Sequence, residues 1–202
     1  MNLKSILTVV FLSLFNFLFA QEISKLKTGD IIFQTSHSKT AAAIELATHS
    51  KFSHVGMVLN DNGKLYVLEA VQPVSITPIQ EFIERGEKSY YEVKRLKNAD
   101  EKFTPQLQQQ LIKKGKTFKG LNYDFAFSWN DNELYCSELV YKMYKEILNT
   151  ELAKPKALKT FDLSSKPVQE QLALKYGKNI PYNELMISPQ QIYKSPLLVF
   201  VK

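Results

Sequence analysis

Two short apolar segments joined by an Asn-Gly pair constrain the fold of this chain more than any other feature of its sequence. Residues 54–60 and 65–70 both have strand character, and Asn62-Gly63 stands midway between them. An Asn-Gly pair predicts a tight hairpin turn because both of its residues adopt positive φ angles at low cost. A two-residue turn at this place fixes the register of the strands and sets Gly56 opposite Glu69.

This register brings a histidine and a carboxylate together. Side chains alternate along a strand, so His54 lies on the same face as Gly56 and is a diagonal neighbour of Glu69. A glycine between the two longer side chains leaves room for them to meet. A slip of one residue would place them on opposite faces of the sheet. Because a carboxylate can orient a histidine that acts as a general base, His54 and Glu69 are candidate catalytic residues.

Cys136 is the only cysteine of the chain and stands where a helix is expected to begin. Leu139 and Val140 follow it at helical spacing, so the helix starts near Ser137 and Cys136 shares its apolar side. The positive end of a helix dipole favours the thiolate form of a cysteine. We expect this helix to pack against the face of the sheet that carries His54, with the sulfur within about 3 to 4.5 Å of a ring nitrogen. The alternative is a small buried hydrophobic residue without a chemical role.

The rest of the chain adds further strands and helices. Strands are expected at residues 31–33, 90–96 and 197–201, the last one buried, and helices at residues 40–48, 78–84, 105–118 and 188–193. Residues 71–74 are expected to leave the sheet as an extended segment, and the aromatic residues 125–129 to be packed in the core. The polar, lysine-rich residues 149–180 suggest an insertion or a lid.

The first twenty residues have the composition of a secretory signal peptide. Lys4 is their only charged residue, residues 6–19 are almost wholly apolar, and Ala20 precedes Gln21. The apolar run is too short for a comfortable membrane span. We therefore expect residues 1–20 to be removed and residues 21–202 to form a single exported domain, periplasmic or secreted, that meets the membrane only transiently during export.

Charge and residue types argue against several functions. The formal net charge of +6 is mild and spread along the chain, so it gives little support to nucleic-acid binding, although it is compatible with an anionic polymer such as cell wall. The sequence has no glycine-rich phosphate loop, and no cofactor is expected. His37 and His49 lack the close ligand spacing of a metal site, and no metal is predicted. The sequence leaves the oligomeric state open.

Several short motifs together point to a known family. In chain order they are Leu26 followed by Gly29-Asp30-Ile31-Ile32-Phe33, then Ser53-His54-Val55-Gly56, Glu69-Ala70, Tyr123-Asp124 and Tyr135-Cys136-Ser137-Glu138-Leu139-Val140. In this order and spacing the chain resembles the YiiX/YebB-like group of the circularly permuted NlpC/P60 papain-like cysteine hydrolases. The resemblance extends from about Leu26 to Val201.

The resemblance implies a papain-like α+β fold in which an antiparallel sheet packs against the helix that carries the cysteine. It also implies hydrolysis of amide or peptide bonds, typically in cell-wall peptides. Cys136 would be the nucleophile, His54 the base and acid, and Glu69 the orienting carboxylate. Tyr123 and Tyr135 would lie near the site and, with Gln34 from the polar segment after the first strand, are the candidate substrate-binding residues.

Two alternatives stay open. Related permuted branches act on lipids as acyltransferases, and the aromatic residues Phe125, Phe127 and Trp129 could line an apolar groove for such a substrate. The third possibility is a binding module that keeps the fold without turnover. A cysteine that proved fully buried with no open pocket beside it would favour this last function.

Overall fold

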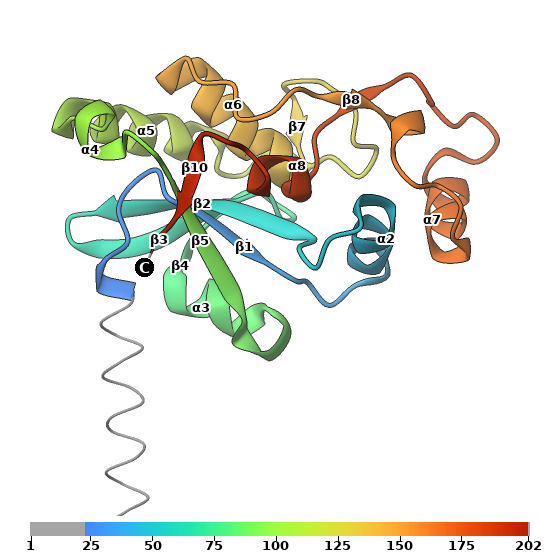
Figure 1. The fold of residues 1–202 in the computed structure, drawn as a ribbon, viewed down its shortest axis with the longest axis horizontal. Coiled ribbons are helices and arrows are strands. Elements are labelled where there is room, and N and C mark those ends of the chain that lie inside the picture. The colour runs from blue at the N-terminus through green and yellow to red at the C-terminus, as the bar shows by residue number, and fades with distance from the viewer. Residues whose placement is uncertain (1–22, 202) are drawn as a thin grey trace, which may run out of the picture.

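A six-stranded antiparallel sheet forms the centre of the molecule (Figure 1). The computed structural model describes residues 23–201, so the predicted signal peptide lies outside the described residues. The strand order is β10-β5-β1-β2-β3-β4. The strands are β1 (Ile31–Gln34), β2 (His54–Asp61), β3 (Lys64–Glu69), β4 (Ser75–Pro78), β5 (Tyr91–Leu96) and β10 (Leu198–Phe200).

Helices and two small strand pairs surround this sheet. The helices are α2 (Lys39–Thr48), α3 (Ile79–Arg85), α4 (Ala99–Lys102), α5 (Pro105–Phe118), α6 (Cys136–Leu148), α7 (Lys166–Tyr176) and α8 (Pro189–Tyr193), with short 3-10 turns η1 (Glu87–Ser89) and η2 (Leu158–Thr160). β6 (Asn122–Tyr123) pairs with β7 (Glu133–Leu134), and β8 (Lys156–Ala157) pairs with β9 (Leu185–Met186). Among the helices of residues 23–201, none combines the length and apolar character that crossing a bilayer needs.

The hairpin has the predicted register. Val58 pairs with Val67 and Asn60 with Leu65 across β2 and β3. Asn62 and Gly63 adopt φ angles of 54° and 82°, as a turn of this type requires. The turn therefore sets which side chains of the two strands share a face, and the sequence was sufficient to derive it.

Two different sets of helices cover the two faces of the sheet. Figure 1 shows α5 and α6 on one side and α3 on the other. The odd-numbered β2 residues Val55 and Met57 belong to one buried cluster with α5 and α6, whereas Val58 belongs to a second cluster with α3. Alternation along the strand places His54 on the α3 face, with Val58.

The prediction that the cysteine helix packs on the face that carries His54 is therefore wrong. Its premise was that the cysteine and the apolar side of the helix must face the same part of the sheet. Cys136 is the first residue of α6 and His54 is the first residue of β2. Two residues at the ends of their elements can meet beyond the end of the strand, while the body of α6 packs on the opposite face.

Other expectations need correction at the two edges of the sheet. The C-terminal strand is an edge strand, and Val199 and Phe200 are 43% and 53% exposed, because neighbours cover such a strand on one side only. At the other edge, residues 71–74 do not simply leave the sheet. The chain turns there and pairs with β3 as β4, a strand that the sequence did not predict.

Residues 149–180 pack onto the rest of the fold. The segment includes β8, η2 and α7, and β8 pairs with β9 from residues outside the segment. Buried side chains of α7, Val168 and Leu172, form a small apolar cluster with Ala43 of α2 and with Leu158. The segment thus covers α2, which stands directly after β1 and before the histidine strand.

Candidate active site

The hairpin places His54 and Glu69 in direct contact. His54 Nε2 lies 2.6 Å from Glu69 Oε2, and both side chains are buried. Gly56 lets β2 and β3 approach closely at this point, since a Cβ atom there would lie 2.4 Å from a methyl carbon of Val67 and 3.0 Å from the carbonyl oxygen of Leu68. The predicted diagonal contact is confirmed, and it leaves Nδ1 of the imidazole for a second partner.

The second carboxylate oxygen of Glu69, Oε1, also accepts hydrogen bonds. Thr77 on β4 donates its hydroxyl to Oε1 at 2.7 Å, and Arg85 at the end of α3 donates to the same oxygen at 2.5 Å. Burial alone would raise the pKa of Glu69, but the contacts with His54, Arg85 and Thr77 outweigh it and lower the pKa to about 2. Glu69 is therefore a carboxylate at any physiological pH.

His54 is held between a ring, a carboxylate and the thiol. Its imidazole stacks on Phe82 of α3, with 5.7 Å between ring centroids. Burial lowers the pKa of His54, but hydrogen bonding to Cys136 and to Glu69 outweighs it and raises the pKa to about 9. The imidazole thus binds Glu69 directly and is close enough to Cys136 for the thiol to raise its pKa, which is the order of groups that a thiol nucleophile needs.

The start of α6 is fixed by buried polar contacts. A carboxylate oxygen of Glu138 lies 3.4 Å from the backbone N of Tyr135, the residue before the helix. The same buried carboxylate pairs with Lys142 at 2.8 Å. Burial raises the pKa of Glu138 to about 7 although Lys142 opposes it. Ser137 donates its hydroxyl to the carbonyl of Ile187 at 2.7 Å, so the first turn, and Cys136 with it, is held in place.

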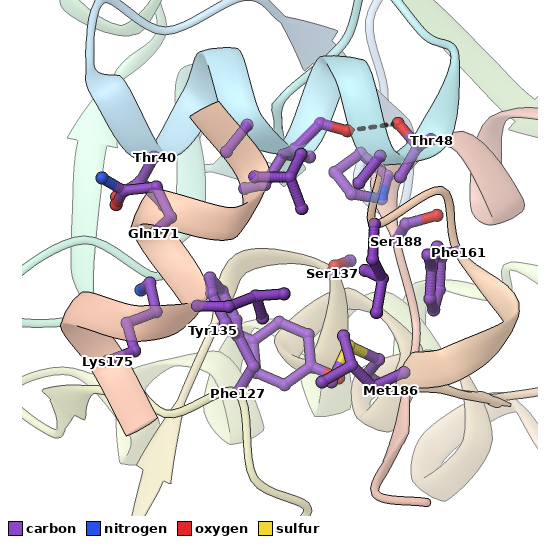
Figure 2. A pocket seen from close by; sticks show the side chains of 18 of the residues that line it. Thr40, Thr48, Phe127, Tyr135, Ser137, Phe161, Gln171, Lys175, Met186 and Ser188 are labelled. Carbon is purple, nitrogen blue, oxygen red and sulfur yellow. Dashed lines mark hydrogen bonds between the residues drawn. The ribbon is translucent and has the colours of Figure 1, made fainter. Parts of the chain in front are cut away.

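An apolar cavity opens directly beside Cys136. Its volume is about 100 Å³ and its lining is almost wholly carbon. Figure 2 shows α2 along one side, with Phe127 and Tyr135 opposite it. Val168 and Leu172 of α7 complete the lining, and Cys136 itself is part of the wall. The thiol is only 2% exposed, yet it borders a space that could hold an apolar group.

The three predicted substrate-binding residues have different positions. Tyr135 lines the cavity, and its hydroxyl accepts the backbone N–H of Ile187 at 3.1 Å. Tyr123 lies near the thiol, since burial and then the charge of Cys136 raise its pKa. Gln34 is the last residue of β1 rather than part of a loop, and it pairs with His54 across the strands.

The side chain of Gln34 is buried and packs against Gly86, where a Cβ would lie 2.3 Å from Oε1. Within residues 23–201 this oxygen has no hydrogen-bond partner. Gln34 is thus a neighbour of the histidine and lies outside the apolar cavity. Among the aromatic residues of the segment 125–129, Phe127 lines the cavity, but Phe125 is 59% exposed, so the prediction that this segment is packed holds only in part.

Sequence reasoning missed Thr77 and Arg85, and also the residues of α2 and α7 that line the cavity. A weak signal for the first pair was available, because a carboxylate buried next to a histidine needs further donors for its second oxygen. Arg85 and Thr77 follow Glu69 in the next two elements of the chain. No comparable signal existed for the α2 and α7 walls of the cavity, because these helices are far apart in sequence from each other.

Comparisons with known proteins show the family and the fold of this chain. The family model of the permuted papain-like amidase enzymes YaeF/YiiX, the C92 family, matches residues 25–202. The chain is 46% identical over 175 residues to the "Uncharacterized protein YiiX" of Escherichia coli (strain K12), which covers 87% of this chain and 85% of that protein. A crystal structure described as metalloprotein yiiX from Escherichia coli O157:H7 has a TM-score of 0.84 and 45% identity, and covers 88% of this chain and 97% of its own.

Proposed function

Because this chain belongs to the C92 family of permuted papain-like amidases, we propose that it hydrolyses amide bonds with Cys136 as nucleophile, His54 as base and acid, and Glu69 as the orienting carboxylate. One observation carries the proposal: Glu69 lies 2.6 Å from one ring nitrogen of His54, and Cys136 is near enough to the same imidazole to raise its pKa. A buried imidazole with a thiol on one side and a carboxylate on the other is suited to proton transfer.

The reaction has two steps. The Cys136 sulfur, having given its proton to His54, attacks the carbonyl carbon, and the backbone N–H of Cys136 stabilises the oxyanion because the first N–H groups of a helix have no acceptor within it. His54 then gives the proton to the leaving amine, and an acyl thioester remains on Cys136. In the second step His54 takes a proton from water, the hydroxide releases the carboxylic acid, and the proton returns to the thiolate.

The apolar cavity favours a substrate whose amide carries an apolar group. Its walls offer almost no hydrogen-bonding partner. Burying an unpaired amide or hydroxyl group there would cost roughly 2–7 kcal/mol, and burying a charged group would cost more. An alkyl or aromatic group on the substrate would instead gain free energy by leaving water. We therefore take an amide with a lipid-like acyl chain as the first substrate candidate.

Cell-wall peptides are the second candidate. They are supported by the amidase description of the family and by the net positive charge of +6, which suits an anionic polymer. Export through residues 1–20 belongs to the same proposal. N-terminal sequencing of the protein recovered from the periplasm or medium tests it, since a chain that still begins at Met1 would contradict export with cleavage.

A metal has no role in this proposal. The related crystal structure is described as a metalloprotein, so the donor set of this chain was considered. Within residues 23–201 there is no group of three or more His, Cys, Asp and Glu side chains placed to hold a metal ion. His54 is engaged with Cys136 and Glu69, and His49 pairs with Asp162 at 3.2 Å. No step of the reaction is therefore assigned to a metal.

A substrate panel tests the proposed function. Purified protein and Cys136→Ala would be incubated with N-acyl amides of increasing chain length and with defined muropeptides, and the products quantified by mass spectrometry. We expect cleavage of the acyl amides that requires Cys136. Cleavage of muropeptides alone would move the assignment to the second candidate. Full activity of Cys136→Ala would eliminate the thiol mechanism for both.

A further inference from the structure

The orienting carboxylate uses its two oxygens for different partners. Oε2 of Glu69 faces His54 Nε2 at 2.6 Å. Oε1 accepts from Thr77 Oγ1 at 2.7 Å and from an Arg85 guanidinium nitrogen at 2.5 Å. Three elements, β2, β4 and α3, thus hold one carboxylate, and Arg85 supplies the only positive charge besides His54 that contacts it among the described residues.

We propose that Arg85 is a positioning residue for catalysis, which keeps Glu69 ionised and turned so that Oε2 faces His54. The proposal rests on the proposed function, because Glu69 needs an orientation only if His54 acts on Cys136. Thr77 assists from β4 as a neutral donor. Neither side chain is assigned contact with the substrate.

The need for Arg85 follows from burial. The side chain of Glu69 is fully buried, whereas that of Arg85 is 44% exposed. A carboxyl group in such a place takes up a proton unless opposite charges and donors hold it ionised. A protonated Glu69 could no longer stabilise the imidazolium form of His54, so the proton transfers at Cys136 would slow.

Arg85 also belongs to the helix that supports the imidazole. Its guanidinium carbon lies 5.8 Å from the ring centroid of Phe82, and that ring stacks on His54. The charged or titratable groups that face Glu69 are His54 from β2 and Arg85 from α3, with the neutral Thr77 from β4. With these partners in place the pKa of Glu69 is about 2, below the range in which an amidase would be assayed.

The test compares pH profiles of variants. Arg85→Gln removes the charge, Arg85→Lys keeps it, and Thr77→Val removes the neutral donor. Lys88→Gln is the matched control, because Lys88 is a largely exposed cation near α3 whose partner is Glu87 at 3.8 Å. Activity on the best substrate of the panel would be measured from about pH 3 to 9, and the Glu69 carboxyl carbon, assigned with Glu69→Gln, would be followed by NMR from about pH 1 to 9, so that both ranges include a pKa that rises from its low starting value.

Loss of the positive charge raises the pKa of Glu69, because burial is then less opposed. We expect the carboxyl titration of Arg85→Gln to move up by about one pH unit or more, as for other carboxylates that lose an arginine partner. The acid limb of kcat should move in the same direction, with KM unchanged. Arg85→Lys should restore most of the profile, Thr77→Val should shift it less, and Lys88→Gln should not shift it.

Two results separate the possible failures. If Arg85→Gln shows the wild-type carboxyl titration and acid limb, the role of Arg85 is wrong even though Cys136→Ala is inactive. A uniform loss of activity at every pH, with no shift of the titration, would also contradict it, since that is the effect of a purely structural residue. If Cys136→Ala is active, the proposed function itself has failed, and the NMR titration still reports whether Arg85 keeps Glu69 ionised.

Discussion

The histidine side and the cavity side of this site are built in opposite ways. The histidine side consists of four residues from four consecutive elements, β2, β3, β4 and α3, joined by short polar contacts. These residues are His54, Glu69, Thr77 and Arg85. The cavity is apolar and lies between segments far apart in the chain, such as α2 and α7, whose Thr40 and Gln171 are 131 residues apart. The comparison suggests that local structure sets the chemistry and long-range packing sets which substrate reaches it.

The two sides should therefore respond differently to mutation. Changes on the histidine side should lower turnover for every substrate. Changes on the cavity side should alter the preference among substrates and the attachment of α7, with the chemistry intact. The following predictions test this division, from the largest expected effect to the smallest.

Glu69→Gln should have the largest effect. The amide keeps the size of the carboxylate but neither fixes the imidazole tautomer as well nor stabilises the imidazolium. We expect kcat/KM to fall by roughly 10²- to 10⁴-fold for all substrates, with the fold retained. Steady-state kinetics and circular dichroism provide the measurement. Wild-type kinetics in this variant would show that another group orients His54.

Ala43→Leu should change selectivity instead of chemistry. Ala43 of α2 is buried and lines the cavity, so a larger side chain fills space that a long acyl group would use. We expect the ratio of kcat/KM for long over short acyl chains to fall by about tenfold or more, within the range that apolar pockets provide. Ala42→Leu, at an exposed position of the same helix, is the matched control. An equal loss for all chain lengths would argue against the cavity as the substrate pocket.

Gly56→Ala should destabilise the hairpin on the histidine side. A Cβ there would lie 2.4 Å from Val67 Cγ1 and 3.0 Å from the carbonyl oxygen of Leu68, so the strands must shift. We expect the free energy of unfolding to fall by about 1–3 kcal/mol, the usual cost of overpacking. Val67→Ala removes the closest atom, and a double-mutant cycle by denaturant unfolding should give a double mutant more stable than the sum of the single effects. Strict additivity would mean that the contact is absent.

Thr40→Val should have the smallest effect. Thr40 donates its hydroxyl to Gln171 Oε1 at 3.0 Å and so joins α2 to α7 over the cavity. Losing this partly buried hydrogen bond should cost about 0.5–1.5 kcal/mol of unfolding free energy or less. Proteolysis of residues 149–180 should become faster, whereas Thr40→Ser, which keeps the hydroxyl, should behave as the wild type. An unchanged proteolysis rate in Thr40→Val would show that other contacts hold α7.

On the histidine side the sequence predicted the pair of His54 and Glu69, because the information for it is local, but it did not predict the donors Thr77 and Arg85. Asn62-Gly63 fixed the hairpin register, and the register fixed the contact between His54 and Glu69. The family resemblance, from short motifs in order, gave the fold that the comparisons support. These inferences needed only the periodicity of a strand and the geometry of one turn.

The remaining features depend on packing that no short segment encodes. The face on which α6 packs was predicted wrongly, because helical spacing identifies an apolar side but not which face of a sheet receives it. β4 was missed because Ser75–Pro78 is short, ends in proline and becomes a strand only by pairing with β3. Of the cavity walls, the sequence analysis anticipated only Phe127 and Tyr135. The walls from α2 and α7 were not predicted, since these helices meet only in the folded chain.

The central claim is that Cys136 takes an acyl group from the substrate while an apolar chain lies in the cavity. One measurement tests this claim most directly. The protein would be mixed with a long-chain activated acyl ester, quenched in acid and examined by intact mass spectrometry, with the adduct located by peptide mapping. The account predicts a mass increase equal to the acyl group on the peptide that contains Cys136, lost with time as water hydrolyses the thioester and absent from Cys136→Ala. Turnover of the ester with no acyl group on Cys136, or full turnover by Cys136→Ala, would contradict the account.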